Sequence, residues 1–155
     1  KAELKTSIKQ MEDSIMAIQK DPVQAAKMPS LTNIELINRL LAYYRAYPED
    51  SFSADCLFKV HIKYSDLQAY EQSVAYGDTL IQLFPNYANK DFLLESLAST
   101  YDVLIEPRDP EKVQYYYELL LKEKIKPTKR KDIEKRLKHI EMDFFEYSQY
   151  QMTGK

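Results

Sequence analysis

The sequence predicts an all-α protein, and three observations lead to that prediction. Apolar residues recur at spacings of three and four along most of the 155 residues, as they do on one face of a helix. No segment alternates polar and apolar residues for long enough to indicate a strand, and Val and Thr are sparse. The predicted connections are two to six residues long, so we expect neighbouring helices to pack antiparallel.

Composition excludes several classes of function. Gly77 and Gly154 are the only glycines, so the chain has no glycine-rich phosphate loop and no dinucleotide-binding motif. Two His and one Cys are one ligand short of a closed structural zinc site unless a carboxylate joins them. The net charge of -2 gives the whole molecule no field that attracts nucleic acid. We therefore expect no cofactor, no metal and no nucleic-acid partner.

The cysteine count is compatible with more than one cellular compartment. Cys56 cannot pair within the chain, which fits the cytosol and equally fits an exported protein without disulfides. The sequence begins with Lys1 rather than Met, so we expect that its natural N-terminus has been removed, and a signal peptide or a lipid-anchored segment upstream of Lys1 stays an open alternative.

The first predicted helix, residues 1–20, carries one apolar seam (Leu4, Ile8, Met11, Ile15 and Ile18). The seam either folds back on the rest of the chain or pairs with a copy of itself. Folding back is favoured, because so short a helix is marginally stable alone in water. Asp21-Pro22 ends this helix, and a linker through Met28-Pro29 follows.

Three helices follow the linker. Thr32 and Glu35 form a capping-box pattern for a helix that ends at Pro48. The next two helices are predicted for residues 53–64 and 68–84, the second of which ends at Pro85.

Three more helices complete the prediction of about seven. One covers residues 88–105, and Asp109-Pro110 supplies an N-cap and a first-turn proline for the next, at 111–124. Thr128 can cap the last helix, which we expect to continue through Ile140 and Phe144 to residue 150.

An internal repeat organises these helices. Tyr47-Pro48 and Phe84-Pro85 are 37 residues apart, and each closes a helix. Tyr64 and Tyr101 have the same separation, and each lies near the end of the following helix. This period is typical of stacked helix pairs, because one amphipathic pair cannot bury its apolar face alone.

Two segments resemble the tetratricopeptide repeat (TPR) family. Large residues of its first helix match Leu57, Val60 and Tyr64, followed by Ser73 at the small second-helix position and by Pro85. The next unit matches with Leu94, Leu97, Ala98, Tyr101, Tyr117 and Leu120. The chain departs from the family at His61, where the family has a small residue, at Gly77, where it has an aromatic one, and in a longer turn at 106–109.

The aromatic residue followed by Pro is also similar to TPR domains of bacterial outer-membrane assembly lipoproteins and of periplasmic Tol-associated proteins, over residues 33–125. The resemblance implies a right-handed superhelical array, with residues 1–155 forming one domain: helix 1–20, a repeat core at 33–125 and a capping helix at 128–150. It also implies a periplasmic or outer-membrane-anchored scaffold that binds a protein or peptide in a concave groove. Without the resemblance, a cytoplasmic location is expected.

Tyrosines are the candidate partner-binding residues. With 13 tyrosines among 155 residues, either the rings fill helix contacts or some line a groove, since Tyr combines an apolar ring with a polar tip. The candidates for the groove are Tyr43, Tyr64, Tyr76, Tyr101, Tyr115 and Tyr116.

Residues 122–139 hold nine basic and three acidic side chains, a local charge of +6. The segment either attracts an acidic partner or anionic headgroups, or it is a solvated capping helix with Glu and Lys pairs.

No catalytic arrangement is evident. Cys56 and His61 would point about 140° apart on a helix, so they do not face each other as nucleophile and base, and Cys56 is expected to be a small buried residue. The sequence thus favours a non-catalytic scaffold for protein-protein interaction. The alternatives are a self-assembling protein that oligomerises through the N-terminal helix, and an enzyme whose cleft gathers titratable groups.

Overall fold

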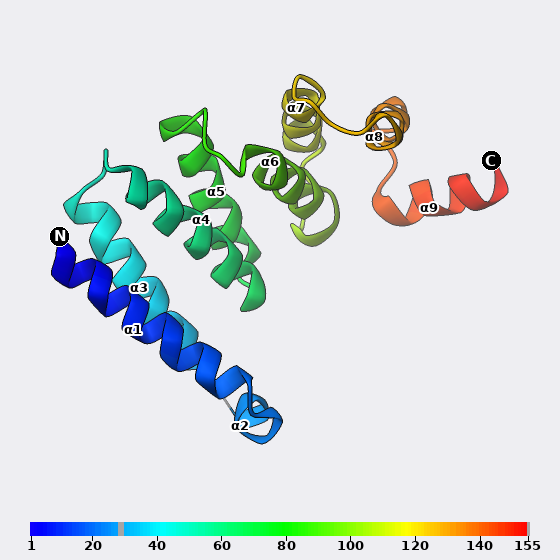
Figure 1. Cartoon of the computed structure of the whole chain (residues 1–155). Helices are drawn as coiled ribbons and strands as arrows, with labels where there is room; N and C mark the ends of the chain where they lie inside the picture. The colour runs from blue at the N-terminus through cyan, green and yellow to red at the C-terminus, as the bar shows by residue number, and fades with distance from the viewer. Residues whose placement is uncertain (28–29, 155) are drawn as a thin grey trace. The chain divides into compact units, whose positions relative to one another are not determined.

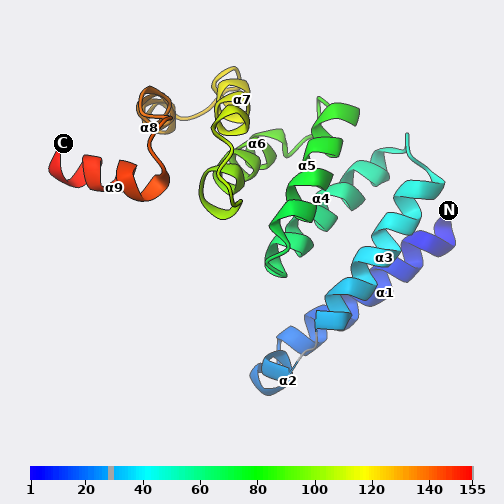
Figure 2. The same ribbon diagram turned by 180° about the vertical axis from the view of Figure 1, so that it is seen from behind.

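The computed structural model describes residues 1–27 and 30–154, and this part of the chain is all-helical, with 79% helix and no strand. The prediction of an all-α protein is confirmed. The elements are α1 (Ala2–Gln19), α2 (Pro22–Lys27), α3 (Ser30–Ala46), α4 (Ser51–Asp66), α5 (Tyr70–Leu83), α6 (Lys90–Ser99), the π-helical segment η1 (Thr100–Leu104), α7 (Pro110–Leu121), α8 (Pro127–Lys138) and α9 (Phe144–Thr153). Figures 1 and 2 show them from opposite sides. The linker predicted at Met28-Pro29 lies outside the described residues.

Contacts divide the chain into two compact units, residues 1–80 and 81–155. The boundary falls near the end of α5, inside the segment predicted as the repeat core. Each unit has its own buried residues, so each is described separately below.

In the first unit, α1 lies along α3 (Figures 1 and 2). Ile8 and Ile15 of the N-terminal seam are 1% and 3% exposed and belong to one apolar cluster with Leu36, Ile37 and Leu40 of α3. The seam therefore folds back as expected, and the apolar face that a second copy would need is covered by α3.

The predicted cap at Thr32 is wrong, because α3 already begins at Ser30 and Thr32 lies within its first turn. Glu35, the other half of that pattern, accepts a hydrogen bond from Arg39 Nε at 3.0 Å, one helical turn further on. A favourable side-chain pair at i and i+4 has replaced the expected cap.

A short turn joins α4 to α5. The amide of Ala69 donates to Tyr64 O and that of Gln68 to Ser65 O, each at 2.9 Å, which is the pattern of a Schellman motif. Gln68 has φ = 60°, the left-handed conformation that this motif requires. Across the turn, His61 of α4 contacts Ser73 of α5: His61 Nδ1 is 2.7 Å from Ser73 O, and Ser73 Oγ donates to His61 O at 2.8 Å.

In the second unit, α6 packs against α7 and continues into η1. The predicted start of α7 is confirmed: Asp109 accepts a hydrogen bond from the Lys112 amide at 3.1 Å, and Pro110 is the first helical residue. In η1 the amide of Ile105 bonds to Thr100 O, and the widened turn buries the three consecutive residues Thr100, Tyr101 and Asp102.

The single C-terminal helix predicted from Thr128 to residue 150 is wrong, because the chain forms two helices there. Lys126 is the N-cap of α8, and Pro127 precedes Thr128 inside the helix. The chain then leaves the helix at His139, and a new helix begins after Asp143, whose carboxylate accepts from the Glu146 amide at 2.8 Å. The Glu146 side chain accepts from the Asp143 amide in return, so a capping box fixes the start of α9.

The 37-residue repeat is visible in the backbone. The amide of Asp50 donates to Tyr47 O at 3.1 Å, and the amide of Tyr87 donates to Phe84 O at 3.0 Å. A second hydrogen bond recurs in each turn: the amide of Ser53 donates to Asp50 O at 2.9 Å, and the amide of Lys90 donates to Tyr87 O at 3.1 Å. The same turn therefore precedes α4 and α6.

Burial repeats at the same interval. Four buried positions of α4 and their equivalents 37 residues later in α6 are at most 1% exposed: Cys56 and Leu93, Leu57 and Leu94, Val60 and Leu97, His61 and Ala98. The helices α4 and α6, with the turns that precede them, are thus built on one local pattern.

Candidate functional site

The six candidate tyrosines fall into separate places in the two units. Tyr43 is fully buried, and its hydroxyl donates to the Asp50 carboxylate. Burial and this bond raise the pKa of Tyr43, while the same bond lowers the pKa of Asp50. Because its ring belongs to the core of the first unit, Tyr43 offers no surface to a partner.

Two ring pairs repeat in the structure. Tyr64 stacks on Tyr76 with ring centroids 5.7 Å apart and planes 7° from parallel, at the edge of the core of the first unit. Tyr101 stacks on Tyr116 at 6.0 Å and the same 7°. In the second unit, Tyr116 is 1% exposed and Tyr115 is 52% exposed. Of the three candidate tyrosines in that unit, Tyr115 therefore presents the most surface to solvent. The stacks mainly join the helices of a pair, and the structure does not bring the six tyrosines into one groove.

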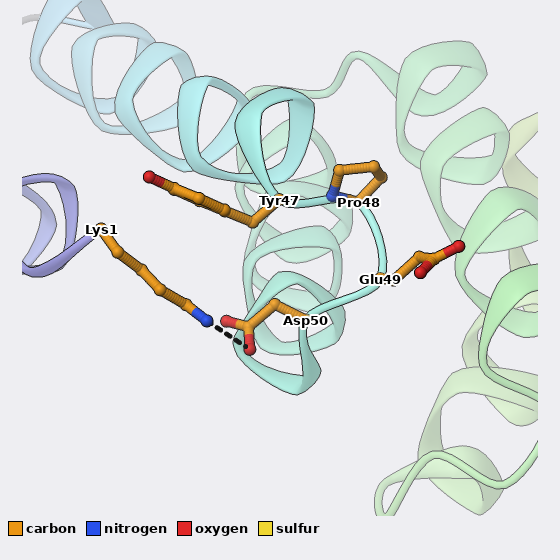
Figure 3. A pocket seen from close by; sticks show the side chains of 5 residues that line it. All are labelled: Lys1, Tyr47, Pro48, Glu49 and Asp50. Atoms are coloured by element: carbon orange, nitrogen blue, oxygen red, sulfur yellow. Dashed lines mark ion pairs between the residues drawn. The ribbon is translucent and has the colours of Figure 1, made fainter.

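A shallow hollow in the first unit lies at the turn before α4 (Figure 3). Lys1 reaches the Asp50 carboxylate at 3.2 Å, and its ammonium lies 5.4 Å from the centre of the Tyr47 ring. Glu49 points away from this ion pair. Lys1 and Asp50 are already paired with each other, so neither of these two charges is free to select a ligand.

A buried charge network organises the second unit. Arg136 of α8 donates two hydrogen bonds to Asp102 of η1, from Nε at 2.9 Å and from Nη2 at 2.8 Å. Arg108 donates a third, from Nε at 2.7 Å. The side chains of Arg136 and Asp102 are 6% and 2% exposed. Two guanidinium groups thus neutralise one buried carboxylate, and α8 is held against η1.

Arg136 also places α9. It donates to the carbonyls of His139 at 2.9 Å and Met142 at 2.8 Å, which fixes the turn between α8 and α9. Its guanidinium lies 4.6 Å from the centre of the Tyr147 ring, and Tyr147 is 5% exposed. The network therefore positions the surface that α8 and α9 share.

The larger hollow on this surface, of about 490 Å³, is named here the α8–α9 groove. Aromatic and aliphatic side chains from α7, α8 and α9 line it: Tyr117, Ile133, Phe144 and Tyr147. Polar side chains, among them Lys126 and Asp132, surround this lining. Burial raises the pKa of Tyr117 and of Tyr147, so both phenols stay neutral hydrogen-bonding groups. Phe144 is 48% exposed and lines this groove.

A second hollow, of about 440 Å³, lies beside the first and is named the basic hollow. Residues of α8 and α9 line it, including Lys135, Lys138, His139 and Tyr150. Tyr147 and Gln151 of α9 line both hollows, so the two hollows adjoin each other at that helix.

Two further residues with reactive side chains, Cys56 and His61, are both buried. Cys56 is fully buried, as expected, and burial raises the pKa of its thiol to about 12. Burial lowers the pKa of His61, whose ring is bonded to Ser73. Among residues 1–27 and 30–154, no group of three or more His, Cys, Asp or Glu side chains is placed to hold a metal ion.

Sequence reasoning missed the residues that shape this surface. Asp102 and Arg136 are 34 positions apart, and nothing in either local pattern indicates that they meet. One signal was available: Arg136 lies three positions after Ile133, so it shares the apolar face of α8.

Comparisons with protein-family models, with curated proteins and with solved structures find no match to this chain. Within the described residues, no helix has both the length and the hydropathy to cross a membrane.

Proposed function

We propose that this chain is a non-catalytic helical-repeat protein of the tetratricopeptide kind, which binds another protein. The observation that carries the proposal is the 37-residue recurrence of turn hydrogen bonds and buried positions in α4 and α6 and in the turns that precede them. Repeated helix pairs of this kind present extended surfaces rather than enclosed pockets, and such surfaces suit protein partners.

The α8–α9 groove is the proposed contact surface. It combines an aromatic lining with surrounding polar groups, which is the composition of protein-protein interfaces. The exposed Phe144 supplies an apolar anchor, and the buried Arg136 network holds the groove in shape without the partner. A segment of a partner protein would therefore find a preformed site.

The proposed setting is the bacterial cell envelope, and it rests on the resemblance carried by Tyr47-Pro48 and Phe84-Pro85. Self-assembly through the N-terminal helix is not proposed, because α3 covers the seam that it requires.

Photo-crosslinking in cells that naturally produce the chain tests the proposal. A photoreactive phenylalanine analogue replaces Gln151, which lines the groove, or Gln10, an equally exposed glutamine on α1. We expect irradiation to give a discrete adduct with one other protein from position 151 and none from position 10. The exchange Phe144→Asp should remove that adduct while leaving the helical circular dichroism unchanged. No adduct from position 151, or the same adduct from both positions, would contradict the proposal.

A further inference from the structure

Most of the positive charge in residues 122–139 is not used within the chain. Three of the nine basic side chains are committed: Lys129 pairs with Glu95 at 2.6 Å, Arg130 donates to the carbonyls of Leu121 and Glu123, and Arg136 binds Asp102. The other six have no ion-pair partner in the described part of the chain: Lys122, Lys124, Lys126, Lys131, Lys135 and Lys138.

Two of these lysines stand at the basic hollow. Lys135 and Lys138 are exposed, and both lie in the last turn of α8. Basic residues there often complement the negative end of the helix dipole. At this helix end, however, Arg136 already binds the carbonyls of His139 and Met142. The two ammonium groups are therefore available to a ligand.

The hollow also has aromatic walls. The ring of His139 lies 4.3 Å from that of Tyr150, measured between centroids, and 6.2 Å from that of Tyr147. A ligand that enters would meet both the two ammonium groups and the aromatic ring surface that line the hollow. This combination fits carboxylates that flank an aromatic or aliphatic side chain.

We propose that the basic hollow binds an acidic segment of the partner protein, in which carboxylates pair with Lys135 and Lys138 and a neighbouring apolar side chain packs on His139 and Tyr150. The proposal rests on the proposed function and names the chemistry of the partner. Charge complementarity selects the segment, and continuity with the groove through Tyr147 and Gln151 lets one partner occupy both hollows. A lipid surface fits less well, because flat headgroups would not reach the rings inside a concave site.

Selection from a library of random 12-residue peptides displayed on phage tests this inference. The immobilised full chain is compared with two double variants of equal charge change, Lys135→Glu/Lys138→Glu at the hollow and Lys122→Glu/Lys124→Glu before α8. We expect the wild type and the second variant to enrich peptides with several Asp or Glu around an aromatic residue, and the first variant to lose them.

Fluorescence anisotropy then measures the affinity of the tightest acidic peptide. We expect the hollow variant to weaken binding by about tenfold or more and the control variant by less than about threefold, because charges at the contact act more strongly than distant ones. Equal weakening by both variants would overturn the proposal, since it would mean attraction by the general field. Enrichment of neutral or basic peptides would also overturn it.

Vesicles containing phosphatidylglycerol distinguish the other anionic source. Binding to these vesicles that the hollow variant abolishes, with no acidic peptide enriched, would overturn the inference in favour of a membrane contact. Failure of the inference is separable from failure of the proposed function. If the wild type selects neutral peptides and Phe144→Asp abolishes their binding, the α8–α9 groove remains a protein-binding site, but the acidic segment is rejected.

Discussion

At the residue scale, His61 shows how one side chain can mark a difference between two otherwise similar repeats. It occupies the position that Ala98 holds 37 residues later, and both are at most 1% exposed. The larger polar ring is accommodated because Ser73, its neighbour on α5, is small and supplies a carbonyl and a hydroxyl to it. His61 thus gives α4 and α5 a polar contact at a position where its equivalent, Ala98, has no polar side chain.

The burial of His61 predicts a pH dependence of stability. The pKa of His61 is lowered in the folded chain. At pH values between that lowered pKa and about 6.5, the unfolded state therefore binds more protons than the folded state. Stability should therefore fall as the pH drops below about 7, by up to about 1.4 kcal/mol per pH unit. Urea unfolding followed by circular dichroism between pH 7.5 and 5.5 measures this slope. His61→Gln should flatten it, and an unchanged slope in that variant would refute the assignment.

The Asp102 network predicts a large effect from one substitution. Arg136→Met leaves the 2%-exposed carboxylate of Asp102 with Arg108 alone and removes the contacts that hold the turn before α9. The free energy of unfolding should fall by roughly 3–5 kcal/mol. Lys129→Met breaks a more exposed pair with Glu95 and should cost at most about 1 kcal/mol. Chemical denaturation of both variants gives the comparison, and similar costs would contradict the role of the network.

At the element scale, helix identity was largely readable from the sequence, while several helix ends were not. The start of α7 was predicted, because Asp109-Pro110 is a local signal that nothing else overrides. The break between α8 and α9 was missed, because the apolar spacing continues across it. That break depends on Arg136, which binds the carbonyls of the turn only because Asp102 holds it in place.

The Schellman turn between α4 and α5 predicts a stabilising exchange. Gln68 adopts φ = 60°, a conformation that costs a residue with a side chain roughly 1 kcal/mol relative to glycine. Gln68→Gly should therefore raise the free energy of unfolding by about 1 kcal/mol. Ala75→Gly, at an exposed position in the interior of α5, should lower it by about 0.5–1 kcal/mol. Thermal unfolding distinguishes the two, and a loss of stability in both variants would refute the turn geometry.

At the scale of the whole molecule, the sequence predicted the all-α class and the 37-residue period, and the structure shows that period in hydrogen bonds and burial. It did not predict the surface at α8 and α9. Periodicity reports which face of a helix is apolar, but it does not report which distant charges meet, and Asp102 reaches Arg136 through a π-helical turn that has no simple sequence signature.

The contact of an acidic partner segment with α8 and α9 is the central functional claim, and nuclear magnetic resonance tests it most directly. The ¹⁵N-labelled chain is titrated with the tightest peptide from the selection. The account predicts that the largest amide shifts fall within residues 126–151 and that α1, α3 and α4 keep their signals in place. Largest shifts in α1, α3 or α4, with residues 126–151 unchanged, would contradict it.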